Sequence, residues 1–283
     1  MQYSKNLVKN KIIGFTHLIL KTKVGKIFGE AIINDLMNRE KTVIYKNEKF
    51  NFSVPNRLNN FRVDTFSTKE PETLEWIDTM PNESTFWDIG ANIGLYSIYA
   101  AKVKNCSVFS FEPSVFNLEL LARNIYLNQL QNKITIIPFA LSDKMSFNSM
   151  HLTTTEWGGA LSTFGEDIGW DGAPIDEKFN FSTIGCSVDE AVSNFKIPQP
   201  NFIKIDVDGI EHFILKGSKK VLKNITSLLI EVNDNYEEQS KKCSEYLMNA
   251  GMVLSKKLHS NMLENSKAGF NNTYNQIWVR GNK

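Results

Sequence analysis

Residues 85–94, Thr-Phe-Trp-Asp-Ile-Gly-Ala-Asn-Ile-Gly, are the stretch that decides the fold. The apolar run at 85–89 predicts a short buried strand, and the glycine that follows it predicts a sharp turn. Gly90 allows the chain to leave the strand abruptly, and Gly94 allows the predicted helix at 94–103 to approach closely. Backbone N–H groups at the start of such a helix face a ligand, so this unit predicts a binding site.

The same alternation of strand and helix continues along the chain. Short apolar runs lie at 107–112, 134–140, 202–207 and 227–232, and helical stretches lie at 114–129, 209–223 and 236–250. Alternation of this kind predicts parallel strands, right-handed crossovers and helices on both faces. With two final strands near 252–254 and 276–279, the prediction is an α/β fold with a seven-stranded, mostly parallel sheet.

The glycine spacing at the first turn indicates which ligand it suits. A dinucleotide fingerprint requires glycines at 90, 92 and 95, but these positions hold Gly90, Asn92 and Leu95. The spacing Gly-x-x-x-Gly behind Asp88 suits S-adenosylmethionine, which has no pyrophosphate but carries an ammonium group. Asp88 can hold that ammonium directly or through water. A purely structural glycine turn, ending at Gly94, is the alternative.

Polar residues at the ends of the next two strands extend this site. Glu112 lies 22 residues after Gly90, where an acid reaches ribose hydroxyls and accepts two hydrogen bonds. Ser142 and Asp143 follow the third strand, and Asp143 can accept a hydrogen bond from the adenine amino group. Capping of a turn by Ser142 and Asp143 is an equally good interpretation.

Five separated blocks of the chain resemble the FkbM-type methyltransferase family. They are FWDIGANIGLYSIYAA (86–101), FSFEPSVFNLELLARNIYLNQL (109–130), ITIIPFALSDK (134–144), FIKIDVDGIEHFILKGSKKVL (202–222) and SLLIEVN (227–233), with SVDEAV (187–192) also in the family's order. The resemblance implies a Rossmann-like class I methyltransferase fold. It also implies methyl transfer from S-adenosylmethionine to a hydroxyl oxygen, often on a sugar or a polyketide.

The resemblance carries over to single positions. It makes Asp88, Gly90, Asn92 and Gly94 the first cofactor motif and Glu112 the ribose contact. The leading hypothesis is O-methylation of a sugar in a surface glycan or similar glycoconjugate, with S-adenosylmethionine as the cofactor. Methylation of a small natural product or lipid-linked acceptor is one alternative, and a non-catalytic cofactor-binding module is another.

A cluster of acids follows the fourth and fifth predicted strands. We predict Asp206, Glu231 and His212 as the catalytic residues, because a hydroxyl acceptor must lose its proton to a base. Two alternatives stay open. In one, Asp206, Glu231 and Asn233 bind a divalent cation such as Mg²⁺, although we expect no metal. In the other, Asp208 and Glu211 only cap the amino end of a helix.

Four residues are predicted to meet the acceptor: Asp208, Trp157, Glu70 and Arg62. Asp208 stands where Glu is more usual in the family, a one-carbon retraction that keeps the charge. Trp157, before two glycines, suits stacking on a sugar or else anchors its own loop. Arg62 suits a phosphate or carboxylate of the acceptor or else an ordinary salt bridge. Glu70 can reach the acceptor or the cofactor from a lead-in helix.

We divide the chain into a basic lead-in at 1–80 and a methyltransferase domain at 81–283. Within the domain, 144–200 is predicted to be an irregular lid or substrate insertion. In the lead-in, 8–28 predicts one helix, and 42–66 predicts short strands that bend at Asn47. Thr68 is the predicted N-cap of a further helix that ends near Met80.

The charge is unevenly distributed, although the chain totals +1. Residues 1–29 contain six lysines and no acid. The near-neutral total argues against a nucleic-acid partner. The basic helix at 1–28 packs either on the domain's flank or on an anionic membrane surface. The three scattered cysteines favour a reducing compartment, so we expect a cytoplasmic enzyme, with contact to the inner face of the membrane as the alternative.

Overall fold

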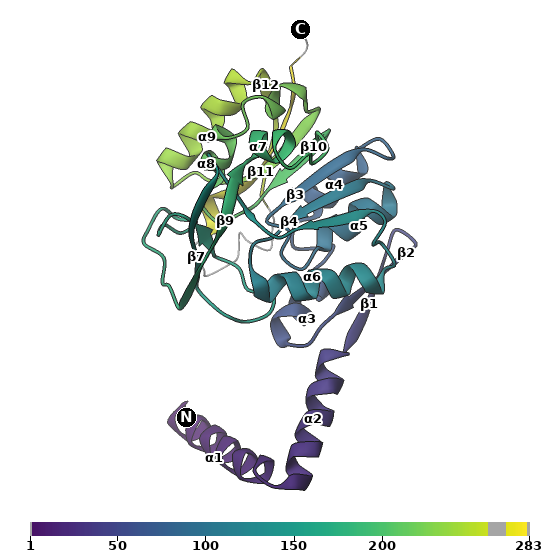
Figure 1. The fold of residues 1–283 in the computed structure, drawn as a ribbon, viewed down its shortest axis with the longest axis vertical. Coiled ribbons are helices and arrows are strands. Elements are labelled where there is room, and N and C mark those ends of the chain that lie inside the picture. The colour runs from purple at the N-terminus through teal and green to yellow at the C-terminus, as the bar shows by residue number, and fades with distance from the viewer. Residues whose placement is uncertain (1, 260–269, 282–283) are drawn as a thin grey trace.

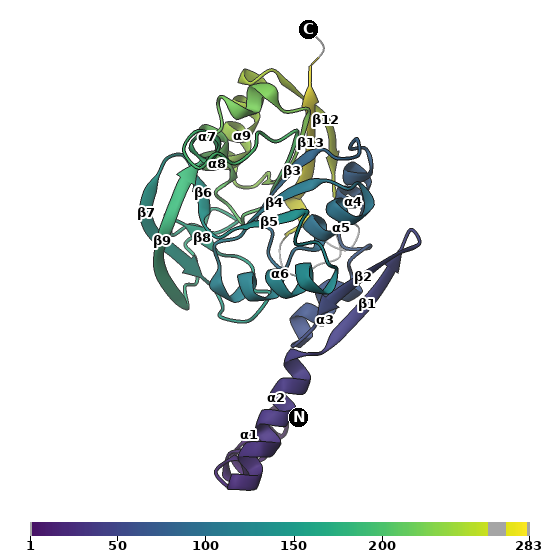
Figure 2. The same ribbon diagram turned by 45° about the vertical axis from the view of Figure 1, so that its right-hand side comes forward.

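The computed structural model describes residues 2–259 and 270–281. A body built on one large sheet carries a smaller sheet at its side, and two helices stand away from it (Figures 1 and 2). These are α1 (Gln2–Leu20) and α2 (Lys23–Met37). The single helix predicted at 8–28 is therefore wrong, because the chain bends sharply between Leu20 and Lys23.

The large sheet has seven strands in the order β12-β13-β11-β10-β3-β4-β5. Their bounds are β3 (Thr85–Ile89), β4 (Ser107–Phe111), β5 (Ile134–Ile137), β10 (Phe202–Ile205), β11 (Ser227–Asn233), β12 (Met252–Leu258) and β13 (Thr273–Arg280). The first five are parallel, and β13 runs antiparallel to both β11 and β12. The predicted α/β fold with a seven-stranded, mostly parallel sheet is confirmed.

The strand order reverses between β3 and β10. From β3 the chain moves outward through β4 and β5, and it then crosses to β10 on the other side of β3. The connections from β3 and β10 run in opposite directions, so a crevice opens between them at the carboxyl ends of the strands. Open α/β sheets bind their ligands in such a crevice. The reversal therefore places a ligand crevice beside Gly90 and Asp206.

Helices cover both faces of the large sheet, as predicted. The bounds are α4 (Pro71–Asp78), α5 (Leu95–Val103) and α6 (Val115–Leu127) on one face, and α7 (Val188–Ser193), α8 (Glu211–Lys216) and α9 (Glu237–Asn249) on the other. Neighbouring strand residues point to opposite faces. Thus Phe86 packs in the cluster under α4 and α5, whereas Trp87 packs in the cluster under α8 and α9.

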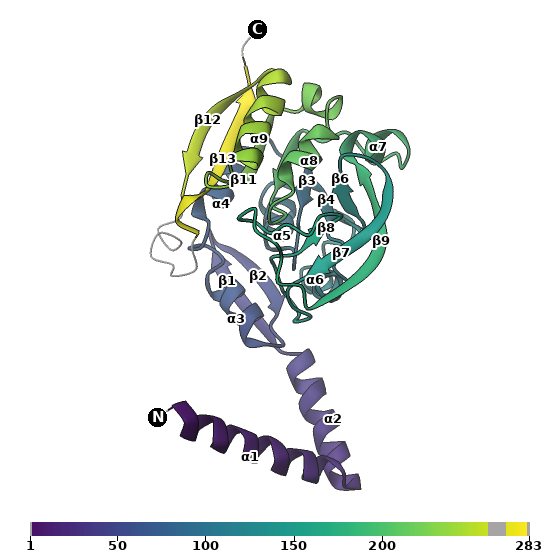
Figure 3. The ribbon, with the colours of Figure 1, turned by 90° about the vertical axis from the view of Figure 1, so that its left-hand side faces the viewer.

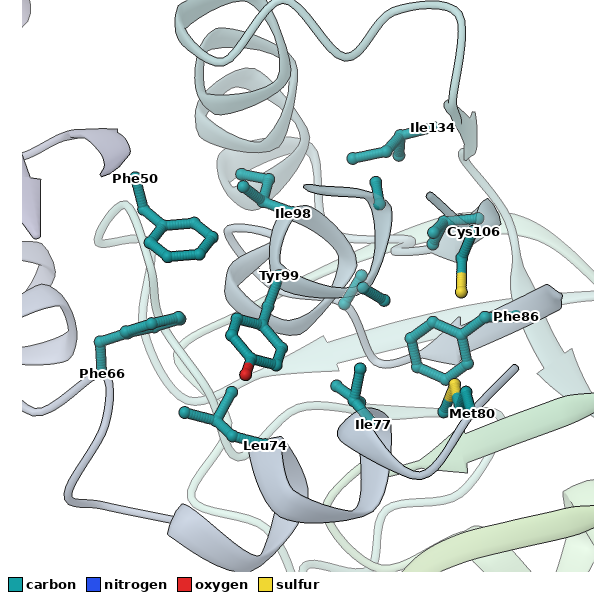
Figure 4. Packing of buried hydrophobic residues seen from close by; sticks show 14 of the residues in the cluster. Phe50, Phe66, Leu74, Ile77, Met80, Phe86, Ile98, Tyr99, Cys106 and Ile134 are labelled. Carbon is teal, nitrogen blue, oxygen red and sulfur yellow. The ribbon is translucent and has the colours of Figure 1, made fainter. Parts of the chain in front are cut away.

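The lead-in forms part of the body rather than a separate layer. Strands β1 (Glu40–Tyr45) and β2 (Glu48–Ser53) form a hairpin, with Lys46 and Asn47 in the left-handed region as a two-residue turn requires. The predicted bend at Asn47 is confirmed. The aromatic rings of Phe50, Phe66 and Tyr99 then meet over α5, with centroids 5.3–6.0 Å apart (Figure 4).

Three predictions about helices are wrong: one helix was not expected, one begins later than predicted and one ends earlier. Residues 57–64 form α3 (Arg57–Asp64) instead of a strand, because the Asn56 side chain accepts a hydrogen bond from the Asn59 N–H and caps a helix there. Helix α4 begins at Pro71 after Glu70, not after Thr68. The helix predicted at 209–223 ends at Lys216, and a 3₁₀ turn, η1 (Val221–Asn224), follows.

The insertion at 144–200, predicted to be irregular, supplies three strands of a second sheet. They are β7 (Ser146–Leu152), β8 (Thr163–Phe164) and β9 (Phe179–Ser187), and β6 (Ala140–Ser142), just before the insertion, completes the order β6-β9-β7-β8. The strands β7 and β9 are rich in Ser, Thr and Asn, a composition more typical of loops than of buried strands. One face of an antiparallel sheet can meet water, so polar residues are tolerated at alternate positions. Figure 3 shows this sheet beside the large one.

We expect Phe50→Ala to lower the free energy of unfolding by about 3–5 kcal/mol, because the ring is completely buried. The matched control is Phe147→Ala, whose ring is 73% exposed, and which should change stability by no more than about 0.5 kcal/mol. Chemical denaturation of both variants measures the difference. A single transition that moves as a whole is expected. A separate early transition in Phe50→Ala would contradict the shared core.

Candidate active site

A cavity of about 350 Å³ lies at the carboxyl ends of the central strands. Its walls come from the ends of β3, β4, β10 and β11, from α3, and from the segment 159–164. Of the residues predicted from the sequence, Gly90, Asn92, Glu112, Asp206, Glu231, Asp208 and Arg62 line it. The fold thus brings together predicted residues that lie up to 169 positions apart in the chain, from Arg62 on α3 to Glu231 in β11.

The turn after β3 forms the floor of this cavity. Gly90 has a φ of +82°, and a Cβ there would lie 1.9 Å from the Asp206 carbonyl oxygen, so no larger residue fits. Gly94 has a φ of +84° and starts α5. Between them Asn92, with a φ of +49°, donates from its backbone N–H to Glu112 at 2.8 Å. The turn and the acid are therefore fixed to each other.

Glu112 is held by backbone donors at the end of β4. One of its oxygens accepts from the Asn92 N–H and the other from the Ser114 N–H, both at 2.8 Å. Burial raises the pKa of Glu112 to about 7, against the opposing effect of these hydrogen bonds. The carboxyl keeps lone pairs for a ligand, and hydroxyl donors would suit it.

Asp88 lies beneath the turn rather than on the cavity wall. It is 1% exposed, and its Oδ2 accepts a 2.6 Å hydrogen bond from the Ser97 hydroxyl, while its Oδ1 has no partner within the described residues. Burial raises its pKa, which the nearby Lys204 opposes. The predicted direct contact of Asp88 with a ligand ammonium does not match this position.

Ser142 and Asp143 also lie outside the cavity wall, contrary to the prediction. Strand β6 leads them away into the second sheet, where Asp143 forms a 2.8 Å ion pair with Lys216. The residues just before them, Phe139 to Leu141, line the cavity instead. The predicted site at the third strand is thus displaced by two or three residues and is apolar.

Three acids share the opposite wall. Asp206 and Asp208 follow β10, and Glu231 lies in β11. Burial and the charge of Asp206 raise the pKa of Asp208 to about 6 and that of Glu231 well above its usual value. Asp208 also accepts a 2.7 Å hydrogen bond from the Leu161 N–H. Carboxyl groups tuned in this way can accept a proton near neutral pH.

A lysine buried in β10 balances these acids. Lys204 is 1% exposed; it forms a 2.7 Å ion pair with Asp206 and lies 5.0 Å from the centre of the Tyr96 ring. Burial lowers its pKa, but Asp206, Asp88 and Glu70 outweigh that effect and raise it overall. Sequence reasoning missed this residue, although a lysine in the middle of the apolar run Phe-Ile-Lys-Ile was a visible signal.

Glu70 belongs to the same charged network, in a smaller cavity of about 60 Å³ that shares Asp206 with the large one. Its carboxylate accepts from the Tyr96 hydroxyl at 2.8 Å and pairs with Lys69 at 2.6 Å. Burial alone would raise its pKa, but Lys69, Lys204 and these hydrogen bonds lower it to about 2. Lys69 lines both cavities and was also missed from the sequence.

His212 lies on α8 outside the cavity, which contradicts its predicted catalytic role. Its ring packs 4.2 Å from the Phe213 ring and 5.9 Å from the Tyr236 ring, and burial lowers its pKa to about 4. The adjacent Glu211 accepts from the backbone N–H groups of Val207 and Gly209, which is the capping role left open above. Across 2–259 and 270–281, no cluster of three His, Cys, Asp or Glu side chains suits a metal ion.

A belt of polar side chains fixes the segment 157–159 over the cavity. The Trp157 carbonyl accepts from Asn56 and Asn59 at 2.9 and 2.7 Å, the Gly158 carbonyl accepts from Arg62 at 2.9 Å, and the Gly159 carbonyl accepts from Asn92 and Asn117 at 2.7 and 3.1 Å. We call these five side chains the amide belt, although Arg62 contributes a guanidinium. The Trp157 side chain does not line the cavity, so the predicted sugar stacking does not match its position.

The chain is similar in sequence to known methyltransferases. The family model described as "Methyltransferase FkbM domain" matches residues 88–270. The hexuronic acid methyltransferase AglP of Haloferax volcanii is 26% identical to the chain over 165 residues. That alignment covers 56% of this chain and 59% of AglP, so the chain spans somewhat over half the length of this relative.

Solved structures resemble the chain more distantly. A precorrin-6y C5,15-methyltransferase from Geobacter metallireducens has a TM-score of 0.45 and 14% identity, over 75% of this chain and 87% of that one. TYW2 of M. jannaschii, in complex with AdoMet, has a TM-score of 0.44 and 14% identity, over 86% and 87%. Because these scores are low, the fold assignment depends on the strand order itself.

We expect Gly90→Ala to lower the free energy of unfolding by more than about 3 kcal/mol, since the added methyl group would overlap the Asp206 carbonyl. Gly251→Ala is the matched control. Gly251 has a similar φ of +79°, but its Cβ would meet nothing closer than 3.4 Å. The control should therefore cost only the backbone strain, about 1–2 kcal/mol. Equal losses in thermal or chemical denaturation would contradict the close approach at Gly90.

Proposed function

The chain belongs to the FkbM methyltransferase family, and from this premise we propose that it methylates a hydroxyl oxygen of a sugar in a glycan or glycoconjugate. It is an S-adenosylmethionine-dependent methyltransferase. The sugar acceptor is supported by the relative AglP, whose name is hexuronic acid methyltransferase. The observation that carries the proposal is one cavity with a glycine turn and Glu112 on one side and three acids on the other.

The residues around the glycine turn fit the adenosyl part of the methyl donor. Because the Asp206 carbonyl fills the place of a Cβ at Gly90, the turn packs tightly against the end of β10 and presents backbone without a side chain to the cavity. Glu112 would accept from ribose hydroxyls, and the apolar residues Phe139 to Leu141 would cover the adenine ring. The acids of the opposite wall favour a cationic group, and a sulfonium ion is cationic.

The protein's task in such a reaction is to position the acceptor and to remove its proton. The donor supplies an already activated methyl group, which a nucleophilic oxygen displaces in line. We propose Asp208 as the general base, because its pKa of about 6 leaves it ionised at neutral pH yet basic enough to take a proton. Asp206 is occupied by its ion pair with Lys204 and would orient the acceptor.

An acidic sugar fits the charges of the wall shared by the two cavities. Arg62 and Lys69 both lie there. Lys69 is paired with Glu70, whereas the Arg62 guanidinium donates from Nε to the Gly158 carbonyl and carries its positive charge at the cavity wall. A guanidinium can bind a carboxylate through two parallel hydrogen bonds. A hexuronic acid would place its carboxylate at Arg62 while a ring hydroxyl meets Asp208.

Glu112→Gln should weaken S-adenosylmethionine binding about tenfold to a hundredfold, since a charged acceptor of two hydroxyl hydrogens is lost. Glu75→Gln, at an exposed position on α4, is the matched control and should bind like the wild type. Affinity of the wild type should fall as the pH drops through about 7, because protonation removes the acceptor. Isothermal titration calorimetry measures both. Binding indifferent to Glu112 would sink the assignment.

Asp208→Asn should lower kcat at least about a hundredfold at neutral pH, since the amide cannot accept the proton. Glu231→Gln should keep most of the activity, because the amide imitates the protonated carboxyl that burial favours at this position. Wild-type kcat should rise with pH through about 6, where Asp208 becomes ionised. Transfer of a labelled methyl group measures all three. The reverse order of the two variants would make Glu231 the base.

The acceptor class is tested with paired oligosaccharides that contain either a hexuronic acid or the corresponding neutral hexose. Labelled methyl should appear on the hexuronic acid substrate, and alkali-stable label distinguishes a methyl ether from a methyl ester. Arg62→Gln should raise KM for the acidic substrate more than for the neutral one, because only the former offers a carboxylate. Transfer to neither sugar, with S-adenosylmethionine binding intact, would overturn the sugar acceptor but not the methyltransferase.

A further inference from the structure

The helices α1 and α2 form a bent arm that stands away from the body (Figures 1–3). We call residues 2–37 the basic arm. It joins the body through two residues, Asn38 and Arg39, ahead of β1. At about 1.5 Å per residue, α2 alone extends the arm by about 22 Å. Among the residues that the structure describes, no apolar surface of the body covers this helix, and Val24, Ile27 and Phe28 stay exposed.

The helix α2 presents a broad apolar face to solvent. Val24, Ile27, Phe28 and Ile32 recur at the spacing of one helix face, and their side chains are 77%, 68%, 61% and 43% exposed. In α1, Phe15 and Leu18 are 65% and 64% exposed. Isolated exposed apolar residues are ordinary, but a row of them along one helix marks a contact surface.

The arm is also strongly basic. Residues 2–37 contain six lysines and two acids, a net charge of +4, so the rest of the chain carries −3. Lys11, Lys21, Lys23 and Lys26 are exposed, and the last three stand at or just after the bend. On α2, Lys23 flanks the apolar face, and Lys26 and Glu30 lie on the far side of the helix together with Ile33. A helix with lysines on one side and large apolar residues on the other is typical of segments that lie on a membrane.

The bend between α1 and α2 is built into the arm by specific contacts. The Thr22 side chain donates to the Ile19 carbonyl at 2.8 Å and accepts from the Gly25 N–H at 2.9 Å. A Cβ at Gly25 would lie 1.9 Å from the Ile19 carbonyl oxygen, and one at Gly29 would lie 2.6 Å from Leu20. The two helices therefore hold a defined angle and expose the lysines of the bend together.

We propose that the basic arm docks the enzyme on an anionic phospholipid surface, with the apolar face of α2 inserted among the lipids and the lysines at the head groups. No helix in the described part of the chain is long and apolar enough to cross a bilayer. Lysines near such a surface each add attraction that salt weakens. A second copy of the chain is a poorer occupant, since its arm carries the same +4 charge and would repel the first.

Docking through the arm would also orient the cavity. Helix α3, which contributes Leu58, Phe61 and Arg62 to the cavity wall, lies at the end of the body from which α2 departs (Figures 1 and 3). Phe61 is 48% exposed on that side. The arm would thus hold the α3 wall of the cavity toward the membrane, where an acceptor presented at the surface can reach it.

The test is sedimentation of the full chain with vesicles of phosphatidylcholine, with and without phosphatidylglycerol. The wild type should sediment with the anionic vesicles and be released by high salt. Val24→Ser with Phe28→Ser, and separately Lys23→Glu with Lys26→Glu, should each lower the partition coefficient at least about tenfold. All four positions are exposed, so affinity for S-adenosylmethionine should stay unchanged and report an intact fold.

Matched controls lie on the body. Val115→Ser with Phe147→Ser removes one valine and one phenylalanine that are 53% and 73% exposed, and Lys219→Glu with Lys256→Glu reverses two exposed lysines. Both controls should bind vesicles like the wild type. Three results would overturn the proposal: no binding to anionic vesicles, equal binding to neutral vesicles that charge reversal leaves unchanged, or a dimer in sedimentation velocity that depends on Val24 and Phe28.

Discussion

The structure depends on a buried cation, the ammonium of Lys204 in the middle of the large sheet. An ion at this depth costs several kcal/mol unless opposite charges and hydrogen-bond acceptors surround it. Asp206 supplies the direct partner, the Tyr96 ring lies beneath, and Glu70 and Asp88 add negative charge. These groups come from β10, α5, the start of α4 and β3. The groups that neutralise Lys204 therefore connect the lead-in, through Glu70, to the sheet, and they fix the position of Asp206 in the cavity wall.

The fold was predictable because its signals are local. Short apolar runs that end in Gly90, Glu112, Asp206 and Glu231 identify the central strands, and parallel strands bring their ends to one edge. The polar strands β7 and β9 lack that signal, since only one of their faces is buried. The helix α3 was missed for a different reason. Its N-cap by the Asn56 side chain depends on backbone geometry, which composition does not reveal.

Whether a residue lines the cavity was predictable where its position at the end of a strand decides this. It was not predictable where contacts with distant parts of the chain decide it. Glu112 and Asp206 reach the cavity because they stand at strand ends. His212 is only four residues past Asp208, but the rotation of α8 turns it toward Tyr236. Glu70, which pairs with Lys69, also accepts a hydrogen bond from Tyr96, 26 residues further along the chain. No spacing rule predicts that contact.

The amide belt holds the segment 157–159 by its backbone carbonyls and not by its side chains. The path of that segment is consequently independent of which residue stands at position 157. Mutation there changes a side chain outside the cavity lining and leaves the segment attached, whereas Gly158, whose Cβ would lie 2.3 Å from Asn59, must stay. Such an arrangement lets the side chain at position 157 vary while the backbone above the cavity keeps its place.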